Sequence, residues 1–186
     1  VSLKKKFDEN LKKIKQNKIL VLGEIIVDTY RYVDPLGQPW KENILSSNTV
    51  NSESFLGGSV PVANNVSQMS NNVTFVSVYN DNKILNKLKN KINKKIKLKI
   101  FKNSSFMDIE KTRYVNNKTF SKMFEVYNFR NKSLNDQKLK RFLNQEIKNF
   151  DHVIVCDFGH GLINSEIIKI LHKSKYLSAN IQTNSG

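Results

Sequence analysis

The sequence predicts an α/β fold built on an open, mostly parallel sheet. Short, nearly all-apolar segments recur along the chain, at 19–23, 73–78 and 152–156. Strands of this composition are typical of parallel sheets, which are covered on both faces. Segments with helical spacing of apolar residues separate them. Because strands alternate with helices, we expect right-handed crossovers and three layers, α/β/α.

The segments between these strands give the remaining elements. Residues 60–69 have the pattern of a helix with Val62, Val66 and Met69 inward. We expect further helices at 82–93, from a cap at Asn135 to 149, and from a cap at Asn164 to 173. Two further strands are predicted at 96–101 and 177–182.

The N-terminal segment differs from the rest. Residues 1–17 are mainly charged, with apolar residues at helical spacing, namely Leu3, Phe7, Leu11 and Ile14. This pattern predicts an amphipathic surface helix or the end of a linker from a preceding domain. Residues 18–186 would then form one domain, and 186 residues are enough for a sizeable core or for part of a larger domain.

Composition narrows the class of protein. No apolar run approaches the roughly 20 residues of a membrane span, so we expect no membrane partner. Cys156 is the only cysteine, which excludes an internal disulfide framework and favours a cytoplasmic protein.

The net charge of +15 raises the hypothesis of nucleic-acid binding. Against it, 27 of the 31 basic residues are Lys and only four are Arg. Proteins that bind nucleic-acid phosphates or base edges in the grooves rely on the bidentate guanidinium of Arg. The chain also contains 25 Asn, which indicates a coding bias toward Lys and Asn. We therefore expect solvated lysines and no nucleic-acid partner. A nucleic-acid-binding protein would instead show steeply salt-dependent retention on DNA.

Two segments are expected to protrude from the sheet. Residues 30–56 mix aromatic and polar residues with turn signals. Residues 109–115 and 120–129 alternate apolar and polar side chains. The sequence Asn116-Asn117-Lys118, which is typical of a turn, joins them, so we predict a hairpin.

Ligands of open α/β sheets bind at the carboxyl ends of the strands. Four candidate loops lie there, at 24–28, 57–58, 157–161 and 183–186. The pair Gly57-Gly58 suits a hinge or a close approach to a ligand, and a helix begins just after it.

Together these loops resemble those of the ribokinase-like (PfkB-type) carbohydrate kinases, over about residues 18–186. Leu20–Tyr30 resembles the first strand of that family, and Gly57–Val66 its Gly-Gly signature. Lys111–Tyr114 is similar to the Lys-Thr-Arg strand of the heptose-phosphate kinase branch, which is often fused to a nucleotidyltransferase. Cys156–Gly161 resembles the Asp-Tyr-x-Lys-Gly loop of that branch.

The resemblance implies a β-lid, formed by 30–56 and 109–129, that closes on a sugar. It implies transfer of the ATP γ-phosphate, with Mg²⁺, to a hydroxyl of a sugar or sugar phosphate, such as a heptose of the lipopolysaccharide core. It assigns sugar contact to Asp28, Gly57, Gly58 and Asn65, a substrate anion to Lys111 and Arg113, and proximity to the transferring phosphate to Asp157, His160 and Asn184.

Simpler interpretations stay open for the charged residues. Asp28 and Asp157 can each serve only to stabilise a turn, and Lys111 with Arg113 can form a solvated strand face. His160 stands where the branch has Lys, so it carries no fixed charge.

The sequence also departs from the pattern. Pro61 replaces a sugar-binding Asn, and neither the catalytic Gly-Ala-Gly-Asp loop nor the Asn-x-x-Glu magnesium motif is present. Both family motifs lie downstream of the position equivalent to Gly186. We therefore expect the sugar-binding, N-terminal part of a longer kinase, with the fold incomplete at its C-terminus and inactive alone. A homodimer through the lid is expected. The alternative is a non-catalytic ribokinase-like binding or dimerisation module.

Overall fold

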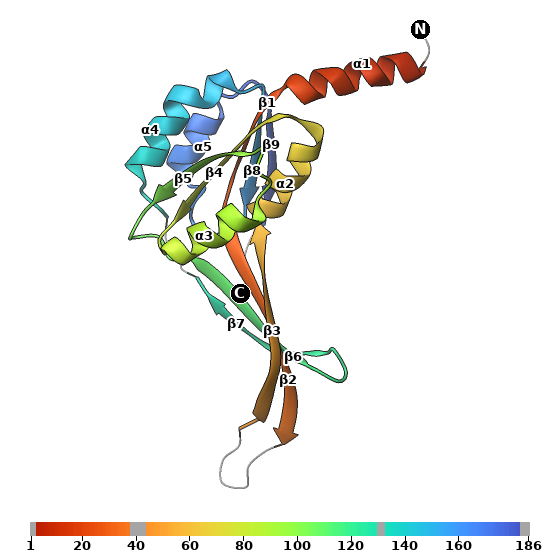
Figure 1. The fold of residues 1–186 in the computed structure, drawn as a ribbon. Coiled ribbons are helices and arrows are strands. Elements are labelled where there is room, and N and C mark those ends of the chain that lie inside the picture. The colour runs from red at the N-terminus through yellow and green to blue at the C-terminus, as the bar shows by residue number, and fades with distance from the viewer. Residues whose placement is uncertain (1–2, 38–43, 130–132, 183–186) are drawn as a thin grey trace.

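Two sheets organise the protein. The computed structural model describes residues 3–37, 44–129 and 133–182. A five-stranded core sheet lies within an α/β domain, and a four-stranded lid sheet extends from one end of it (Figure 1). The predicted fold class, a three-layer α/β/α arrangement with a protruding β-lid, is confirmed.

The core sheet has the strand order β5-β4-β1-β8-β9. Its strands are β1 (Lys18–Gly23), β4 (Asn72–Tyr79), β5 (Lys97–Lys102), β8 (His152–Asp157) and β9 (Leu177–Ile181). Each described pairing between them is parallel, and β1 lies in the centre, with Leu20 opposite Thr74 on β4 and Val153 on β8. The apolar strands of the sequence are thus the interior strands of the sheet.

Helices cover both faces of this sheet. On one face lie α2 (Ser59–Met69) and α3 (Asn82–Lys91); on the other lie α4 (Gln137–Glu146), the 3₁₀ turn η1 (Ile147–Asn149) and α5 (Ser165–Leu171). Strand β1 supplies both cores because its side chains alternate. Leu20 and Leu22 pack toward α4 and α5, whereas Ile19 and Val21 pack toward α2 and α3.

Two local predictions are wrong. Helix α2 buries Val60, Ala63 and Ser67; of the three residues predicted inward, Val62 and Val66 pack partly buried against the core, but Met69 is 56% exposed. Small side chains let the helix lie close to the sheet, which places the Met on the outer side. Helix α4 is capped by Asp136, whose carboxylate accepts a hydrogen bond from Leu139 N, and not by Asn135.

The lid sheet is larger than predicted. Its order is β3-β2-β6-β7, from β2 (Ile25–Gly37), β3 (Ser46–Gly58), β6 (Ile109–Asn116) and β7 (Lys122–Asn128). Strand β2 begins two residues after β1 ends, so 24–28 is not a loop: the chain passes almost directly from the core sheet into the lid. The hairpin of β6 and β7 is confirmed as an antiparallel pair, and β2 pairs with β6 in parallel.

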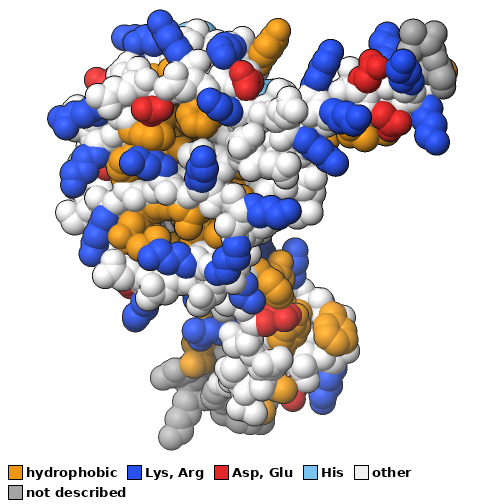
Figure 2. Space-filling view, turned by 45° about the horizontal axis from the view of Figure 1, so that its top comes forward, with side chains coloured by type: hydrophobic (Ala, Val, Ile, Leu, Met, Phe, Trp, Pro, Cys, Tyr) orange, Lys and Arg blue, Asp and Glu red, His pale blue; other side chains and the backbone are white. Residues whose placement is uncertain are grey.

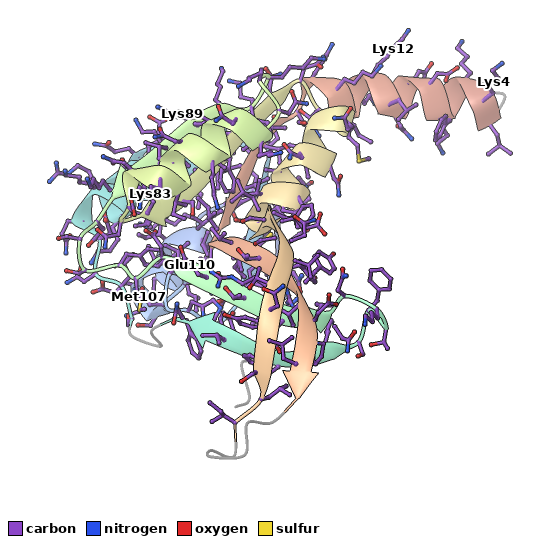
Figure 3. The ribbon with its side chains drawn as sticks, turned by 60° about the horizontal axis from the view of Figure 1, so that its bottom comes forward. Lys4, Lys12, Lys83, Lys89, Met107 and Glu110 are labelled. Atoms are coloured by element: carbon purple, nitrogen blue, oxygen red, sulfur yellow. The ribbon has the colours of Figure 1, made fainter. Side chains whose placement is uncertain are left out.

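Helix α1 (Leu3–Gln16) projects from the domain and has no buried residue (Figure 1). Its C-terminal end is held by a hydrogen bond from Asn71 N to Lys15 O. Lysines spread over the domain and α1 instead of gathering in one patch (Figure 2). Those labelled on α1 and α3, Lys4, Lys12, Lys83 and Lys89, point outward (Figure 3). Among the described residues, no helix is long and apolar enough to cross a membrane.

Candidate functional site

The site is built where the core sheet meets the lid. Here Gly57 and Gly58 end strand β3 and pair with the first residues of β2, so that the prediction of a loop at 57–58 is wrong. A Cβ on Gly57 would collide with the carboxylate of Asp28, and Gly58 has φ 64° with the main-chain oxygen of Glu24 against it. Gly58 therefore requires glycine, for close approach and for its backbone angle, whereas a side chain at Gly57 would have to displace the Asp28 carboxylate.

One face of the lid carries most of the charged and aromatic site residues. We call it the inner lid face, formed by alternate residues on the four paired strands: Asp28, Tyr30, Glu53, Phe55, Lys111, Arg113, Glu125 and Tyr127. Part of it forms a shallow hollow of about 430 Å³, lined by Asp28, Tyr30, Tyr32, Glu53, Phe55 and Arg113. Lys111 and Arg113 share this face, as their spacing on one strand predicts.

Ion pairs occupy the inner lid face. Arg113 Nη1 lies 2.6 Å from Asp28 Oδ1, and Arg113 Nε lies 3.0 Å from Glu125 Oε2. Lys111 Nζ lies 3.2 Å from Glu125 Oε1. Both cations predicted to bind a substrate anion are thus paired with carboxylates, and an incoming anion would have to compete with Asp28 and Glu125.

Aromatic rings support the same cations. The Arg113 guanidinium lies 5.1 Å from the centre of the Tyr30 ring, and Lys111 Nζ lies 4.6 Å from that of Tyr127. Contacts of this kind favour a fixed position for the charge. Desolvation acts to lower the pKa of Arg113, but the hydrogen bond and charge of Asp28, together with the charges of Tyr30 and Glu125, outweigh it, so that the pKa is raised. The guanidinium is therefore charged at every relevant pH.

The loop after β8 faces the lid from the core sheet. Asp157 Oδ1 accepts a hydrogen bond from Gly159 N, and Gly159 and Gly161 have φ of 76° and 86°. His160 is buried, and its Nε2 lies 2.6 Å from the hydroxyl of Tyr127 on β7. A continuous line of contacts thus joins the inner lid face to this loop.

Glu24 was missed by the sequence interpretation. It follows Gly23 at the end of β1, and its side chain is fully buried. Its Oε2 accepts a hydrogen bond from Phe158 N at 2.9 Å, and its Oε1 one from His160 N at 3.4 Å. The available signal was an acidic residue directly after a buried strand, within the candidate loop 24–28.

Burial shifts the protonation of this cluster. Desolvation raises the pKa of Glu24 to about 7, with a smaller contribution from the charge of Asp157. Desolvation also lowers the pKa of His160, and the charge of Lys111 acts in the same direction. The pKa of Tyr127 is raised by desolvation and by Asp28 and Glu125. At neutral pH the imidazole is therefore uncharged and the phenol protonated.

Asn65, the remaining predicted site residue within the described ranges, does not join this cluster. Asn65 is exposed on α2, whereas the neighbouring Asn64 accepts a hydrogen bond from Asn93 N and so fastens the turn after α3. Pro61 lies in the first turn of α2, where its missing N–H is not needed. Asn184 lies outside the described residues.

Two other hollows lie outside the inner lid face. One of about 490 Å³ opens at the amino edge of the core sheet, lined by Lys18, Asn72, Thr74, Lys97, Glu146, Lys148, Asn149, Phe150 and Lys175. It is larger than the lid hollow, but none of the motif residues lines it. A third hollow, also of about 490 Å³, lies beside His160 and is lined by Ser104, Ser105 and Ser133 among others.

Met107 and Glu110 mark where the chain enters the lid through β6 (Figure 3). Within the described ranges, no group of three His, Cys, Asp or Glu could hold a metal ion.

Comparison with solved structures decides the fold. The chain superimposes on phosphofructokinase-2 from Escherichia coli in complex with fructose-6-phosphate, with TM-score 0.61 and 11% identity, over 91% of this chain and 56% of that one. For Arabidopsis thaliana ribokinase complexed with ribose and ATP, the TM-score is 0.60 at 10% identity, over 89% and 54%. The chain has the ribokinase-like fold. The resemblance to PfkB-type carbohydrate kinases is confirmed.

Sequence comparison agrees with this assignment. The ribokinase-like chain is 26% identical over 177 residues to the bifunctional protein HldE of Aliarcobacter butzleri (strain RM4018). The match covers 86% of this chain but 35% of HldE, so the chain spans about a third of that relative and just over half of the two solved structures. No family model matches the chain.

Proposed function

We propose that this chain is the sugar-binding half of an ATP-dependent carbohydrate kinase that transfers phosphate to a hydroxyl of a sugar or sugar phosphate. In this proposal residues 18–186 belong to the kinase domain, residues 1–17 form an N-terminal helix or linker, and the protein acts in the cytoplasm. The observation that carries the proposal is the meeting of Asp28, Gly57-Gly58 and the loop Asp157–Gly161 between the core sheet and one face of the lid.

The site residues have distinct roles in this proposal. The Asp28 carboxylate accepts hydrogen bonds from vicinal sugar hydroxyls, and Gly57 leaves room for it. Lys111 and Arg113 hold a substrate phosphate or carboxylate after exchanging their present carboxylate partners, since Arg can bind such a group in bidentate fashion. Asp157 and His160 lie on the side of the transferring phosphate, with Asn184, and Asn65 contacts the sugar only if α2 shifts.

The lid has a mechanical role. The lid closes on the sugar and excludes water. Its hinge is the Gly57-Gly58 end of strand β3. Exclusion of water strengthens every electrostatic interaction within the site. A line of contacts from Asp28 through Arg113, Glu125, Lys111 and Tyr127 to His160 supports this role, because it joins the inner lid face to the loop on the core sheet.

The donor is ATP with Mg²⁺ in the complete protein. ATP and Mg²⁺ supply the transferable phosphoryl group and neutralise its charge. On that side the described residues provide two glycines, Gly159, whose N–H donates to Asp157 Oδ1, and Gly161, but no carboxylate cluster for the metal. We therefore propose that the catalytic base and the metal ligands come from beyond Gly186, and that the chain is inactive alone.

The substrate class and the partners follow from the heptose branch. The Lys111-Thr112-Arg113 motif and the similarity to the bifunctional protein HldE support a heptose phosphate of the lipopolysaccharide core as substrate. They also support a fused nucleotidyltransferase domain in the complete protein. We propose a homodimer through the lid, because Phe124 and Val126 on its outer face are 51% and 45% exposed.

A thermal-shift comparison tests sugar binding. The chain is heated with a heptose 7-phosphate, with fructose 6-phosphate and with each matching unphosphorylated sugar. We expect a rise in Tm with at least one sugar phosphate and loss of that rise in Asp28→Asn, since the variant keeps the shape of the residue and loses its charge. The control Asp8→Asn, on the projecting helix α1, keeps the rise. No rise with any sugar would contradict the proposal.

One observation favours the alternative of a non-catalytic binding or dimerisation module. Asp28 is already neutralised by Arg113 at 2.6 Å, and Pro61 and His160 replace the residues that the family uses. Such a module would show no Tm rise with sugars while still forming a dimer. Analytical ultracentrifugation of wild type and Phe124→Asp, beside the thermal-shift series, separates the two functions.

A further inference from the structure

Glu24 occupies a position that the proposed roles leave unused. It connects the core sheet, the Gly57-Gly58 end of strand β3 and the loop after β8. Its main-chain oxygen accepts hydrogen bonds from Ser59 N at 2.9 Å and Ser59 Oγ at 2.6 Å, at the start of α2. Its side chain turns the other way and reaches the main chain of Phe158 and His160, more than 130 residues along the sequence.

These contacts extend to the lid. The two N–H groups that Glu24 binds flank Gly159, and they set the path of the loop that carries His160. His160 is buried, and its Nε2 lies 2.6 Å from the hydroxyl of Tyr127 on β7. We infer that Glu24 is a positioning residue, whose carboxylate fixes the loop Asp157–Gly161 and thereby the contact between His160 and the lid.

The carboxylate is suited to this task by its geometry. It has two oxygens, and each faces one main-chain N–H group of the loop. A glutamine in its place would still accept from Phe158 but would turn an N–H₂ group toward His160 N, so that two donors face each other. The ionised carboxylate therefore holds the loop better than any neutral residue of the same shape.

The surroundings of Glu24 make its hydrogen bonds to the loop dependent on pH. The groups that face Glu24 are Asp157 and Cys156 on β8, His160 in the loop and Tyr127 on the lid. Desolvation and the Asp157 charge keep the pKa of Glu24 near 7. Loss of the proton near neutral pH completes the two hydrogen bonds, and gain of a proton weakens at least one of them.

The inference deepens the proposed function, and rests on it only for what the loop does to a substrate. The contacts themselves involve no sugar. A test without substrate therefore distinguishes failure of this inference from failure of the kinase assignment: a chain that binds no sugar can still show the Glu24 contact, and a chain that binds sugar can lack it.

Amide NMR across pH 5–9 tests the inference. In the wild type, we expect the amide signals of Phe158 and His160 to move with an inflection near pH 7. In Glu24→Gln that inflection disappears, and His160 reports only its own imidazole, which titrates below its usual 6.5. In Asp157→Asn the inflection persists at lower pH. The matched control Glu166→Gln, an exposed glutamate on α5, leaves it unchanged.

Three outcomes would overturn the inference. One is a wild-type Phe158 amide without an inflection near neutral pH. Another is an inflection that survives in Glu24→Gln. The third is its disappearance in Asp157→Asn alone, which would assign it to Asp157. Should Glu24→Gln fail to fold by circular dichroism, the wild-type and Asp157→Asn titrations still decide, since both keep the Glu24 carboxylate.

Discussion

The core sheet and the lid sheet are stabilised in different ways. Leu20, Val21 and Leu22 in the centre of the core sheet are completely buried, between helices on both faces. In the lid, strand β3 has no buried residue and most of it is exposed. Main-chain pairing, ion pairs and ring contacts hold the lid together instead. The difference indicates that apolar volume governs the stability of the domain, while charge and pH govern the lid.

The largest expected effect is in the core sheet. Leu22→Ala removes a fully buried side chain and leaves a cavity, so we expect a loss of about 3 kcal/mol in the free energy of unfolding, measured in urea. Leu36→Ala, at a position of the lid that is 71% exposed, should change it by less than about 0.5 kcal/mol. Equal losses for the two variants would remove the contrast between the sheets.

The junction between the sheets should show a pH effect of similar size. The pKa of Glu24 is about 7 in the folded chain and 4.5 when unfolded. The folded state therefore holds the proton more tightly, because desolvation of the ionised carboxylate outweighs the two hydrogen bonds that it accepts, and stability falls as pH rises from about 4.5 through about 7. The loss approaches about 3 kcal/mol at the upper end.

The measurement is the free energy of unfolding of wild type minus that of Glu24→Gln, from urea titrations at pH 5, 6, 7 and 8. This difference removes the other titrating groups, which both proteins share. We expect the wild type to lose stability relative to the variant as pH rises. A difference that is flat, or that grows in favour of the wild type, would refute the assignment.

A smaller effect is expected within the lid. Arg113→Ala leaves the carboxylates of Asp28 and Glu125 without their shared cation, and we expect a local loss of about 1–2 kcal/mol. Amide hydrogen exchange should speed up in β6 and β7 and stay unchanged in β4. Arg113→Lys keeps the charge but not the fork, and should recover part of the protection. Equal acceleration in β4 would mean that the lid and the core sheet unfold together.

The smallest effect is expected on the outer lid face. Tyr114 and Phe124 stack there with ring centres 4.4 Å apart. Phe124→Leu should cost about 0.5–1 kcal/mol, by urea unfolding, because the ring contact is lost while an apolar side chain remains. Phe120→Leu is the control, since Phe120 makes only an edge contact of 6.4 Å with Tyr32. An unchanged Phe124→Leu would show that the stack contributes no stability.

Elements could be predicted because their signals are local. Apolar runs such as Ile19–Gly23 and Val73–Val78 gave the core strands, and alternation gave the hairpin of the lid. Faces were harder. Met69 was expected inward, but the close approach of α2 to the sheet is set by Ala63, which the helical period alone does not reveal.

The site was predicted in part. Gly57, Gly58 and Asp28 do meet, and His160 faces the lid. The pairing of Arg113 with Asp28 joins residues 85 positions apart and depends on the register between β2 and β6, which the sequence does not specify. Glu24 was given no role because the sequence after a buried strand looks the same whether the acidic side chain is buried or exposed in a turn.

The central claim is that the junction of the core sheet and the lid binds a sugar. Mapping of amide NMR shifts on addition of a heptose 7-phosphate tests it most directly. We predict the largest shifts at Gly57, Gly58, Phe158 and His160. Largest shifts at Lys18, Lys97 and Lys175, around the hollow at the amino edge of the core sheet, would contradict the account, as would a spectrum that does not change.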